Sequence, residues 1–250
     1  MKETLEIIPV NDAFDAGDEC PFCFLERMSE QRAIRFTLGP GASYMETAVR
    51  EATTQAGFCP EHMKKAFDYG NSLGNGLILQ SYMNQLLQEL QSQLDDFELP
   101  AKRPLFKKKA PAEEPDILAW VKRKTSTCYI CDKNAYNMHR YFCTFFALLK
   151  DPEFRTKVEN CKGFCMRHFA RLLELAPEEL PNAQREWFYP LVLALMRDNL
   201  ARVKGDLDWF VGMFDYRQAG RDWKNARDAV SRTMQKLQGL YPADPPYQQK

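Results

Sequence analysis

A chain of 250 residues is long enough for one large domain or two small ones, each with a hydrophobic core. Its apolar share of 45% and aromatic share of 12% exclude an intrinsically disordered chain. Because 34 Lys and Arg balance 34 Asp and Glu, no net field draws it toward nucleic acid or an anionic membrane.

The N-terminal residues are acidic and no sustained apolar run follows them, so we expect no signal peptide. The longest apolar stretch, residues 188–196, is interrupted by Pro190, whereas a membrane span needs about 20 residues. We therefore expect a soluble, cytoplasmic protein with no membrane attachment. In that reducing compartment its eight cysteines are expected to be metal ligands or redox groups.

Along the first half, only Leu5–Val10 suits a strand or a docked arm. A Cys-x-x-Cys motif begins at Cys20, and Ser43 with Glu46 has the spacing of a helix capping box. Cys59 is the cysteine of a Gly-Phe-Cys-x-x-His motif at residues 57–62. Both cysteines precede a proline, where a helix cap would lie.

Apolar residues then recur every three or four positions, as on a helix with one buried face. In the first half they are Leu79, Tyr82, Met83, Leu86, Leu87, Leu90, Leu94 and Phe97. Residues 99–115 follow, with four prolines and five basic residues, and predict a linker. Its basic run could contact an acidic partner, but a solvated spacer is the preferred interpretation.

The second half repeats the first. Cys128 and Cys131 lie 108 residues after the first Cys-x-x-Cys pair, and Cys165 and His168 lie 106 residues after the first Cys-x-x-His pair. A second periodic helix follows, with apolar residues from Phe188 to Phe214. We therefore predict an all-α protein made of two tandem helical repeats, each organised around one metal site.

The expected domains are residues 1–98, a linker at 99–115, residues 116–240 and a flexible tail at 241–250. In the second half, Asp151-Pro152 is expected to start a helix, and the last helix is expected over 222–237.

Three thiolates and one imidazole form a complete tetrahedral ligand set for zinc. Cysteines at helix N-termini also gain thiolate character from the helix dipole. We therefore predict two Zn²⁺ ions per chain, bound within each half. The ligands would be Cys20, Cys23, Cys59 and His62 in the first half, and Cys128, Cys131, Cys165 and His168 in the second.

In a pairing across the halves, Cys20 and Cys23 would join Cys165 and His168 and interlock the chain. Loops of 35 and 33 residues suffice for local closure, so local pairing is preferred. Other interpretations of the cysteines are an iron–sulfur cluster with three cysteines and one histidine, a thioredoxin-type dithiol, and apolar core packing.

The twin Cys-x-x-Cys and Gly-Phe-Cys-x-x-His motifs are accompanied by Asp215-Tyr216-Arg217 and, after it, Trp223. In these features the chain resembles an uncharacterised prokaryotic family of soluble proteins, from Cys20 to about Leu237. The resemblance implies no activity. Both quartets of the family pattern are intact here.

Four features lie outside the quartets. Cys143 is interpreted as a core residue, and His139 as a surface residue. Cys161 is interpreted as structural, or as an extra thiol near a metal. Asp215-Tyr216-Arg217 could line a cleft for an anionic substrate, but an ion pair that fixes the last helix is preferred.

A structural-zinc protein that binds another protein is the preferred function, because each site is filled by protein ligands. An iron–sulfur protein in electron transfer or cluster handling is one alternative, and an enzyme with a cleft near Asp215-Tyr216-Arg217 is another. Nucleic acid is an unfavoured partner because the chain is neutral and has no basic recognition helix. The sequence leaves the oligomeric state open.

Overall fold

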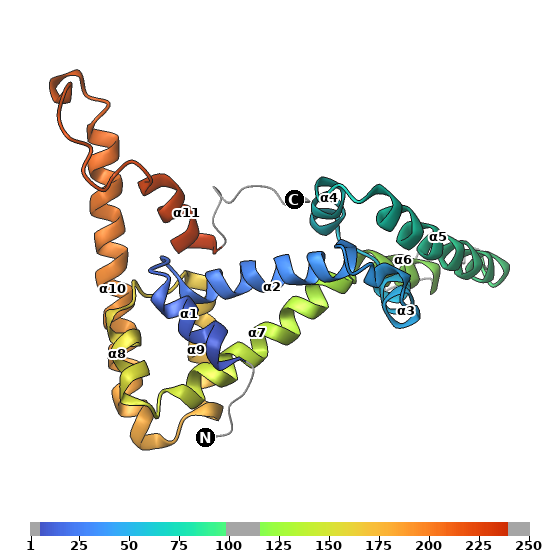
Figure 1. The fold of residues 1–250 in the computed structure, drawn as a ribbon, viewed down its shortest axis with the longest axis horizontal. Helices are drawn as coiled ribbons and strands as arrows, with labels where there is room; N and C mark the ends of the chain where they lie inside the picture. The colour runs from blue at the N-terminus through green and yellow to red at the C-terminus, as the bar shows by residue number, and fades with distance from the viewer. Residues whose placement is uncertain (1–5, 99–115, 240–250) are drawn as a thin grey trace, which may run out of the picture. The chain divides into compact units, whose positions relative to one another are not determined.

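A computed structural model describes residues 6–98 and 116–239 (Figure 1). These residues form α-helices and two short 3₁₀ helices, with no strand among them, so the predicted all-α fold is confirmed. No helix in this part of the chain is both long and apolar enough to cross a bilayer. The predicted linker at 99–115 and tail at 241–250 lie outside the described residues.

The elements before the gap are α1 (Ile7–Asp15), α2 (Pro21–Leu38), η1 (Ser43–Met45), α3 (Thr47–Ala56), α4 (Pro60–Asp68) and α5 (Ser72–Asp95). Those after it are α6 (Asp116–Ser126), α7 (Tyr129–Leu148), α8 (Pro152–Asn160), α9 (Met166–Glu179), α10 (Asn182–Gly212), η2 (Tyr216–Gln218) and α11 (Ala229–Gln238). In both series a helix follows each Cys-x-x-Cys start and each Cys-x-x-His start. An origin by duplication stays a prediction.

The chain forms two compact units whose boundaries differ from the predicted halves. Among the described residues, unit 1 contains 6–29 and 135–239, and unit 2 contains 30–98 and 116–134. Each unit therefore combines segments from both sequence halves. The long helices α2 and α7 each contribute residues to both units.

An aromatic core holds unit 1 together. Phe14 from α1 stacks on Phe145 from α7 with ring centroids 5.6 Å apart, and it meets Phe154 from α8 edge to face at 5.1 Å. Phe22 from α2 and Phe188 from α10 complete this core, and all five rings are buried. Such rings bury a large apolar area, so they fix five helices from distant parts of the chain around one centre.

Unit 2 has a smaller core. Ile34 and Leu38 from α2 pack with Ile78 from α5 and with Tyr129 and Ile130 from α7. Helix α5 also packs against α3, α4 and α6. This core likewise joins residues from the first half to residues from the second.

Several local predictions were wrong. Leu5–Val10 was expected to be a strand or a docked arm; Ile7–Asp15 is helical, so the strand is wrong, and this helix buries Val10 and Phe14, four residues apart, against the core. A short apolar run does not by periodicity alone distinguish strand from helix. The predicted capping-box residues Ser43 and Glu46 bound only the short η1, and α3 begins at Thr47. The last helix was expected to begin at residue 222, but it begins at Ala229. Asp151 does cap α8, accepting a hydrogen bond from Glu153 N at 3.0 Å.

The apolar stripes were expected to face the core, and α5 contradicts this expectation. Leu79, Met83, Leu87, Leu94 and Phe97 are all exposed, whereas Gly74 and Ile78 are the buried residues of α5. The stripe of α10 is divided along its length, with Phe188–Val203 carrying the buried positions and the distal Val211 and Phe214 exposed. A periodic pattern identifies the apolar face of a helix, but not whether the chain itself covers that face.

The α5–α6 contact in unit 2 includes a partly buried carboxylate. Glu89 accepts hydrogen bonds from Trp120 Nε1 and Lys124 Nζ, each at 2.8 Å. Burial alone would raise the pKa of Glu89, but hydrogen bonds from Lys124, Trp120 and Gln85 lower it to about 2. The ionised form is thus favoured in the folded state, and its stabilising effect is present above the unfolded pKa and lost as pH falls toward 2.

Replacing Glu89 with Gln should therefore lower the stability of unit 2 at pH 7 by about 1 kcal/mol, since the site is partly solvated. The deficit should shrink between pH 4.5 and 2, because wild type loses the ionised carboxylate over that range. Urea unfolding followed by circular dichroism at pH 7, 4 and 3 measures this difference. Glu51→Gln removes an exposed carboxylate from α3 and should show no such pH-dependent deficit; a constant deficit for Glu89→Gln would contradict the prediction.

Candidate metal centres

The eight predicted ligand residues meet in two groups of four. One group is Cys20, Cys23, Cys165 and His168, and the other is Cys59, His62, Cys128 and Cys131. Within each group, the ligand atoms all lie within 4.8 Å of one another.

The predicted local pairing is therefore wrong, because each Cys-x-x-Cys meets the Cys-x-x-His of the other half. The physical reason is that loop closure depends only weakly on length. Cys23 and Cys165 are 142 residues apart, about four times the separation of Cys23 and Cys59, and this adds only about 1 kcal/mol of closure entropy. Burial of the two cores outweighs so small a difference.

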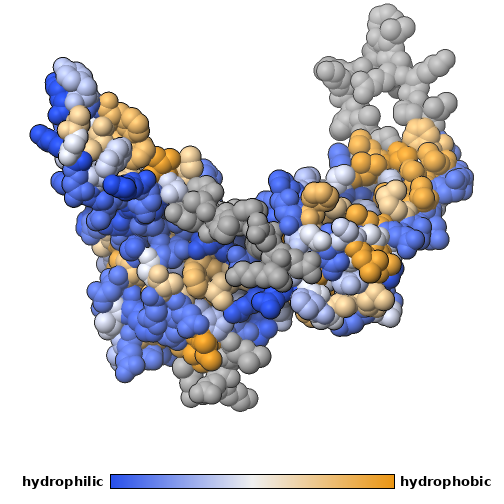
Figure 2. Space-filling model, turned by 45° about the horizontal axis from the view of Figure 1, so that its top comes forward, coloured by the Kyte–Doolittle hydropathy of each residue, from blue (hydrophilic) through white to orange (hydrophobic). Residues whose placement is uncertain are grey.

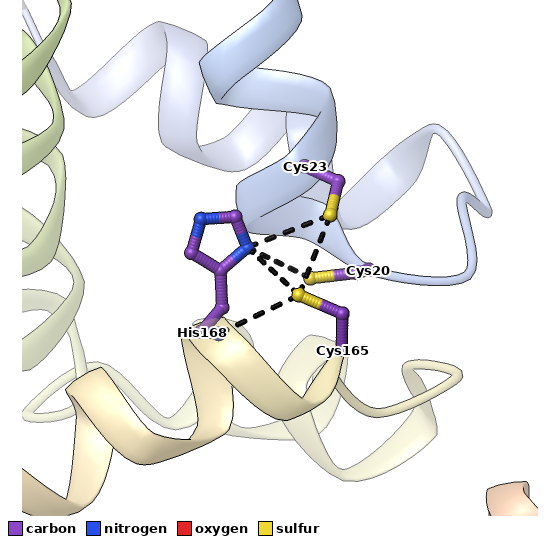
Figure 3. Close-up of side chains that lie close together, drawn as sticks. All are labelled: Cys20, Cys23, Cys165 and His168. Atoms are coloured by element: carbon purple, nitrogen blue, oxygen red, sulfur yellow. Dashed lines mark hydrogen bonds between the residues drawn. The ribbon is translucent and has the colours of Figure 1, made fainter. Parts of the chain in front are cut away.

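Site 1 lies in unit 1, where the side chains of Cys20, Cys23, Cys165 and His168 converge on one point (Figure 3). His168 Nδ1 lies 3.4 Å from Cys20 Sγ, 3.5 Å from Cys23 Sγ and 3.2 Å from Cys165 Sγ. The sulfurs of Cys23 and Cys165 are 3.6 Å apart. All four residues are buried, and the cysteines are fully so.

Site 2 lies in unit 2 and is more open. His62 Nδ1 lies 3.2 Å from Cys59 Sγ and 3.3 Å from the sulfurs of both Cys128 and Cys131. The Cys59 and Cys131 sulfurs are 3.9 Å apart. Cys128 and His62 are buried, but Cys59 is only half-buried and Cys131 is exposed.

Helix N-termini supply every ligand. Cys165 is the N-cap of α9, where its Sγ accepts a hydrogen bond from His168 N at 3.5 Å, and Cys59 is the N-cap of α4. Cys20 and Cys128 directly precede α2 and α7. Free backbone N–H groups and the helix dipole favour negative charge at such ends, so they favour the thiolate that a metal requires.

Two carboxylates that the sequence analysis missed contact the histidines. Glu30 Oε1 lies 2.8 Å from His62 Nε2 and also accepts from Lys65 Nζ at 2.7 Å. Glu26 lies 3.6 Å from His168 Nε2 and pairs with Arg167. Both are on α2, four residues apart, so their helical spacing after Cys23 was the available signal. A carboxylate at Nε2 keeps Nδ1 directed at the sulfurs.

The Gly-Phe pair of each Cys-x-x-His motif has a conformational role. Gly57 and Gly163 have φ of 62° and 74°, a region that favours glycine. A Cβ on Gly163 would lie 3.1 Å from the carbonyl oxygen of Leu195, and one on Gly57 would lie 2.9 Å from the Tyr82 ring. Phe164 is buried, with its ring centroid 5.9 Å from that of Phe22. The pair thus seats the ligand loop against the core.

Helix α11 covers site 1. The buried Lys236 Nζ donates to the backbone carbonyls of Glu19, which precedes Cys20, and of Lys162, in the Gly-Phe-Cys loop. Burial lowers the pKa of Lys236. A Cβ on Gly239 would lie 3.3 Å from Cys165 Sγ, so the end of α11 lies against that sulfur. One side chain therefore ties together both ligand loops.

Protonation differs among the ligands. Burial raises the pKa of Cys128, but the hydrogen bond to His62 outweighs this and lowers it to about 6. Burial lowers the pKa of His62, but hydrogen bonds to Cys128 and Glu30 raise it to about 10. Burial raises the pKa of Cys131 to about 12. In site 1, hydrogen bonds from Cys20 and Cys23 hold the pKa of Cys165 well below its usual range.

The remaining cysteines stay outside both quartets. Cys161 Sγ accepts from Gly163 N at 3.4 Å, and burial raises its pKa to about 11, in agreement with a structural role. Cys143 was expected in the core, but it is half-buried and donates to Glu179 at 3.4 Å. His139 is exposed, as predicted, with Nε2 3.8 Å from Cys143 Sγ.

The Asp215-Tyr216-Arg217 element is a surface turn. Asp215 accepts hydrogen bonds from Arg217 N at 2.9 Å and from the guanidinium Nε at 3.0 Å. From the sequence, this ion pair was expected to fix the last helix. It joins two residues of the turn itself. Arg232 of α11 instead bonds Asp206 of α10 at 2.8 Å, and it also bonds Asp228 at the start of its own helix at 2.8 Å.

The glycine at the start of the site 1 motif offers a test of this geometry. Gly163→Ala should destabilise the protein by about 1–3 kcal/mol, because the methyl group meets a backbone carbonyl at positive φ. Gly205→Ala, on an exposed turn of α10 with nothing within 4 Å, should instead stabilise it by about 0.5–1 kcal/mol. Thermal unfolding by calorimetry measures both, and equal shifts for the two variants would contradict the described loop.

Comparison with known proteins places the chain in a family but adds no activity. No curated protein and no solved structure matches the chain. A family model does match it over residues 1–244, and it is described as a family of unknown function, DUF6062. The chain, with its two Cys₃His quartets, therefore belongs to this family of unknown function, DUF6062.

Proposed function

We propose that the protein binds two zinc ions, one in each quartet, and that the helical body they brace is a scaffold for binding another protein. The observation that carries the proposal is the convergence of three sulfurs and one imidazole nitrogen within 4.8 Å, twice, from residues far apart in the sequence. In site 1 the three thiols and the imidazole are all buried, so they need a shared partner to offset their lost hydration.

The distances fit one tetrahedral ion. With Zn–S near 2.3 Å and Zn–N near 2.0–2.1 Å, ligand sulfurs should be about 3.8 Å apart and sulfur and nitrogen about 3.5 Å apart. The Cys23–Cys165 and Cys59–Cys131 sulfur pairs are 3.6 and 3.9 Å apart, all ligand atoms of a quartet lie within 4.8 Å, and the sulfur–nitrogen distances run from 3.2 to 3.5 Å. In the alternative [4Fe–4S] cluster each ligand binds a different iron, which requires sulfurs farther apart. The spacing therefore favours zinc.

A scaffold role is supported by the ligand count. Each quartet supplies four protein ligands, as in structural zinc sites, and so leaves no position for substrate or water. The alternative of an enzyme with a cleft near Asp215-Tyr216-Arg217 has weaker support, since Asp215 and Arg217 bind each other on the surface. A neutral chain with no net attraction to phosphate favours a protein partner over nucleic acid.

Zinc stoichiometry in paired variants tests both the metal and the topology. Cys20→Ser/Cys165→Ser and Cys59→Ser/Cys128→Ser each damage one quartet, so each should retain about one zinc per chain. Cys20→Ser/Cys59→Ser damages both quartets and should retain none. Mass spectrometry of metals in the purified proteins decides this, with Cys143→Ser as a control that keeps two. Local pairing would reverse the results for Cys20→Ser/Cys165→Ser and Cys20→Ser/Cys59→Ser, and a visible iron–sulfur spectrum would reject zinc.

Release of the two ions should be biphasic. Solvent reaches site 2 through Cys131 and Cys59, whereas α11 covers site 1, so a chromogenic chelator should take zinc from site 2 about tenfold faster or more. Cys131→Ser should abolish the fast phase, and Cys23→Ser, its counterpart in site 1, should abolish the slow phase. Both phases persisting in Cys131→Ser would contradict this assignment.

A further inference from the structure

Helix α5 of unit 2 has its apolar stripe on the face directed away from the unit. Residues of α5 that contact the unit recur at 74, 78, 81, 85 and 89: Gly74 and Ile78 are buried, Ser81 bonds Arg50, and Glu89 bonds Trp120. At 100° per residue, the stripe at 83, 87, 90 and 94 lies on the opposite side of the helix, and Phe97 follows just beyond the helix end at Asp95. Polar side chains thus meet the unit, and apolar ones face solvent.

The stripe is substantially exposed. Met83, Leu87, Leu94 and Phe97 are 48%, 58%, 52% and 43% exposed, and Leu90 between them is half-buried. Orange surface at the right of Figure 2 lies over this part of unit 2. The part of the stripe on α5, from Met83 to Leu94, is about 17 Å long at 1.5 Å per residue. A contiguous exposed apolar strip of this kind marks an interaction surface.

The spacing indicates a helical partner. On α5, the steps of 4, 3 and 4 residues between positions 83 and 94 are those of a coiled-coil seam, in which apolar side chains of one helix fit between those of another. The positions beside this seam within α5 are Asn84, Leu86, Gln91 and Gln93, none of them charged. A seam with neutral flanks has no charge pattern to select a different partner helix, and none that repels an identical one.

We infer that α5 pairs with α5 of a second copy of this chain, antiparallel, through the seam formed by residues 83–94. The acidic end of the segment sets the orientation. A parallel pair would bring together Asp95, Asp96 and Glu98 from both copies, whereas an antiparallel pair keeps these six charges at opposite ends. The short seam places the interface at the small end of specific complexes, so we expect a dissociation constant on the order of micromolar.

Sedimentation velocity of the zinc-loaded, full-length protein from about 1 to 200 µM tests the pairing over a range that brackets this affinity. Wild type should shift from the monomer mass of 29.1 kDa to the dimer mass as concentration rises. Leu87→Glu/Leu94→Glu should remain monomeric, because both leucines are exposed in the single chain and the new carboxylates would repel across the seam. Ser72→Glu/Gln88→Glu adds the same charge at exposed positions of α5 outside the seam and should dimerise like wild type.

A mixing experiment separates a lost seam from a damaged fold. Leu87→Lys/Leu94→Lys should also be monomeric by itself, but an equimolar mixture with Leu87→Glu/Leu94→Glu should form a dimer that weakens with added salt. Zinc content and circular dichroism should match wild type in every variant. A wild-type monomer throughout the concentration range would overturn the inference, meaning that another segment or another protein covers the stripe. So would a mixture that stays monomeric, or glutamate variants that dimerise like wild type.

Discussion

The convergence of each Cys-x-x-Cys with the Cys-x-x-His of the other sequence half is the constraint on which the rest of the structure depends. It brings the N-termini of α2 and α9 together in unit 1, and those of α4 and α7 together in unit 2. The helix N-termini favour each thiolate, but three thiolates held together in water-poor surroundings repel one another and lose their hydration. A cation shared by the four ligands resolves that conflict, which is why the quartets are the natural place for a metal.

The surroundings of the two quartets differ more than their ligands do. In site 1, Lys236 joins both ligand loops from α11, and all four ligands are buried. In site 2, Glu30 holds His62 at 2.8 Å, while Cys131 remains exposed. Site 1 is therefore shielded from solvent by packing. Site 2 is in contact with solvent, and the hydrogen bond with Glu30 orients its histidine. Such outer contacts govern how readily solvent reaches a metal site.

The apolar residues of the two longest helices serve different purposes. The proximal part of α10 covers the aromatic core of unit 1 through residues such as Phe188 and Val192. Helix α5 instead presents its stripe to solvent, while Gln85, Glu89 and other polar residues lie toward α6. The apolar residues of both helices recur every three or four positions. The helices differ in how much of that apolar face the rest of the chain covers.

The sequence by itself determined the helical class, the eight residues of the two quartets as a set, and the helix starts after Cys20, Cys59 and Asp151, because these depend on periodicity, spacing and capping within a few residues. It did not determine how the quartets pair, since loop closure discriminates by only about 1 kcal/mol between near and distant partners. That choice came from the tertiary structure, in which Phe14, Phe22 and Phe154 bury far more surface by joining the two halves than local closure could offer. The tertiary structure also decided which apolar face is buried and placed Glu26, Glu30 and Lys236 at the sites, because contacts between distant residues leave no local pattern to read.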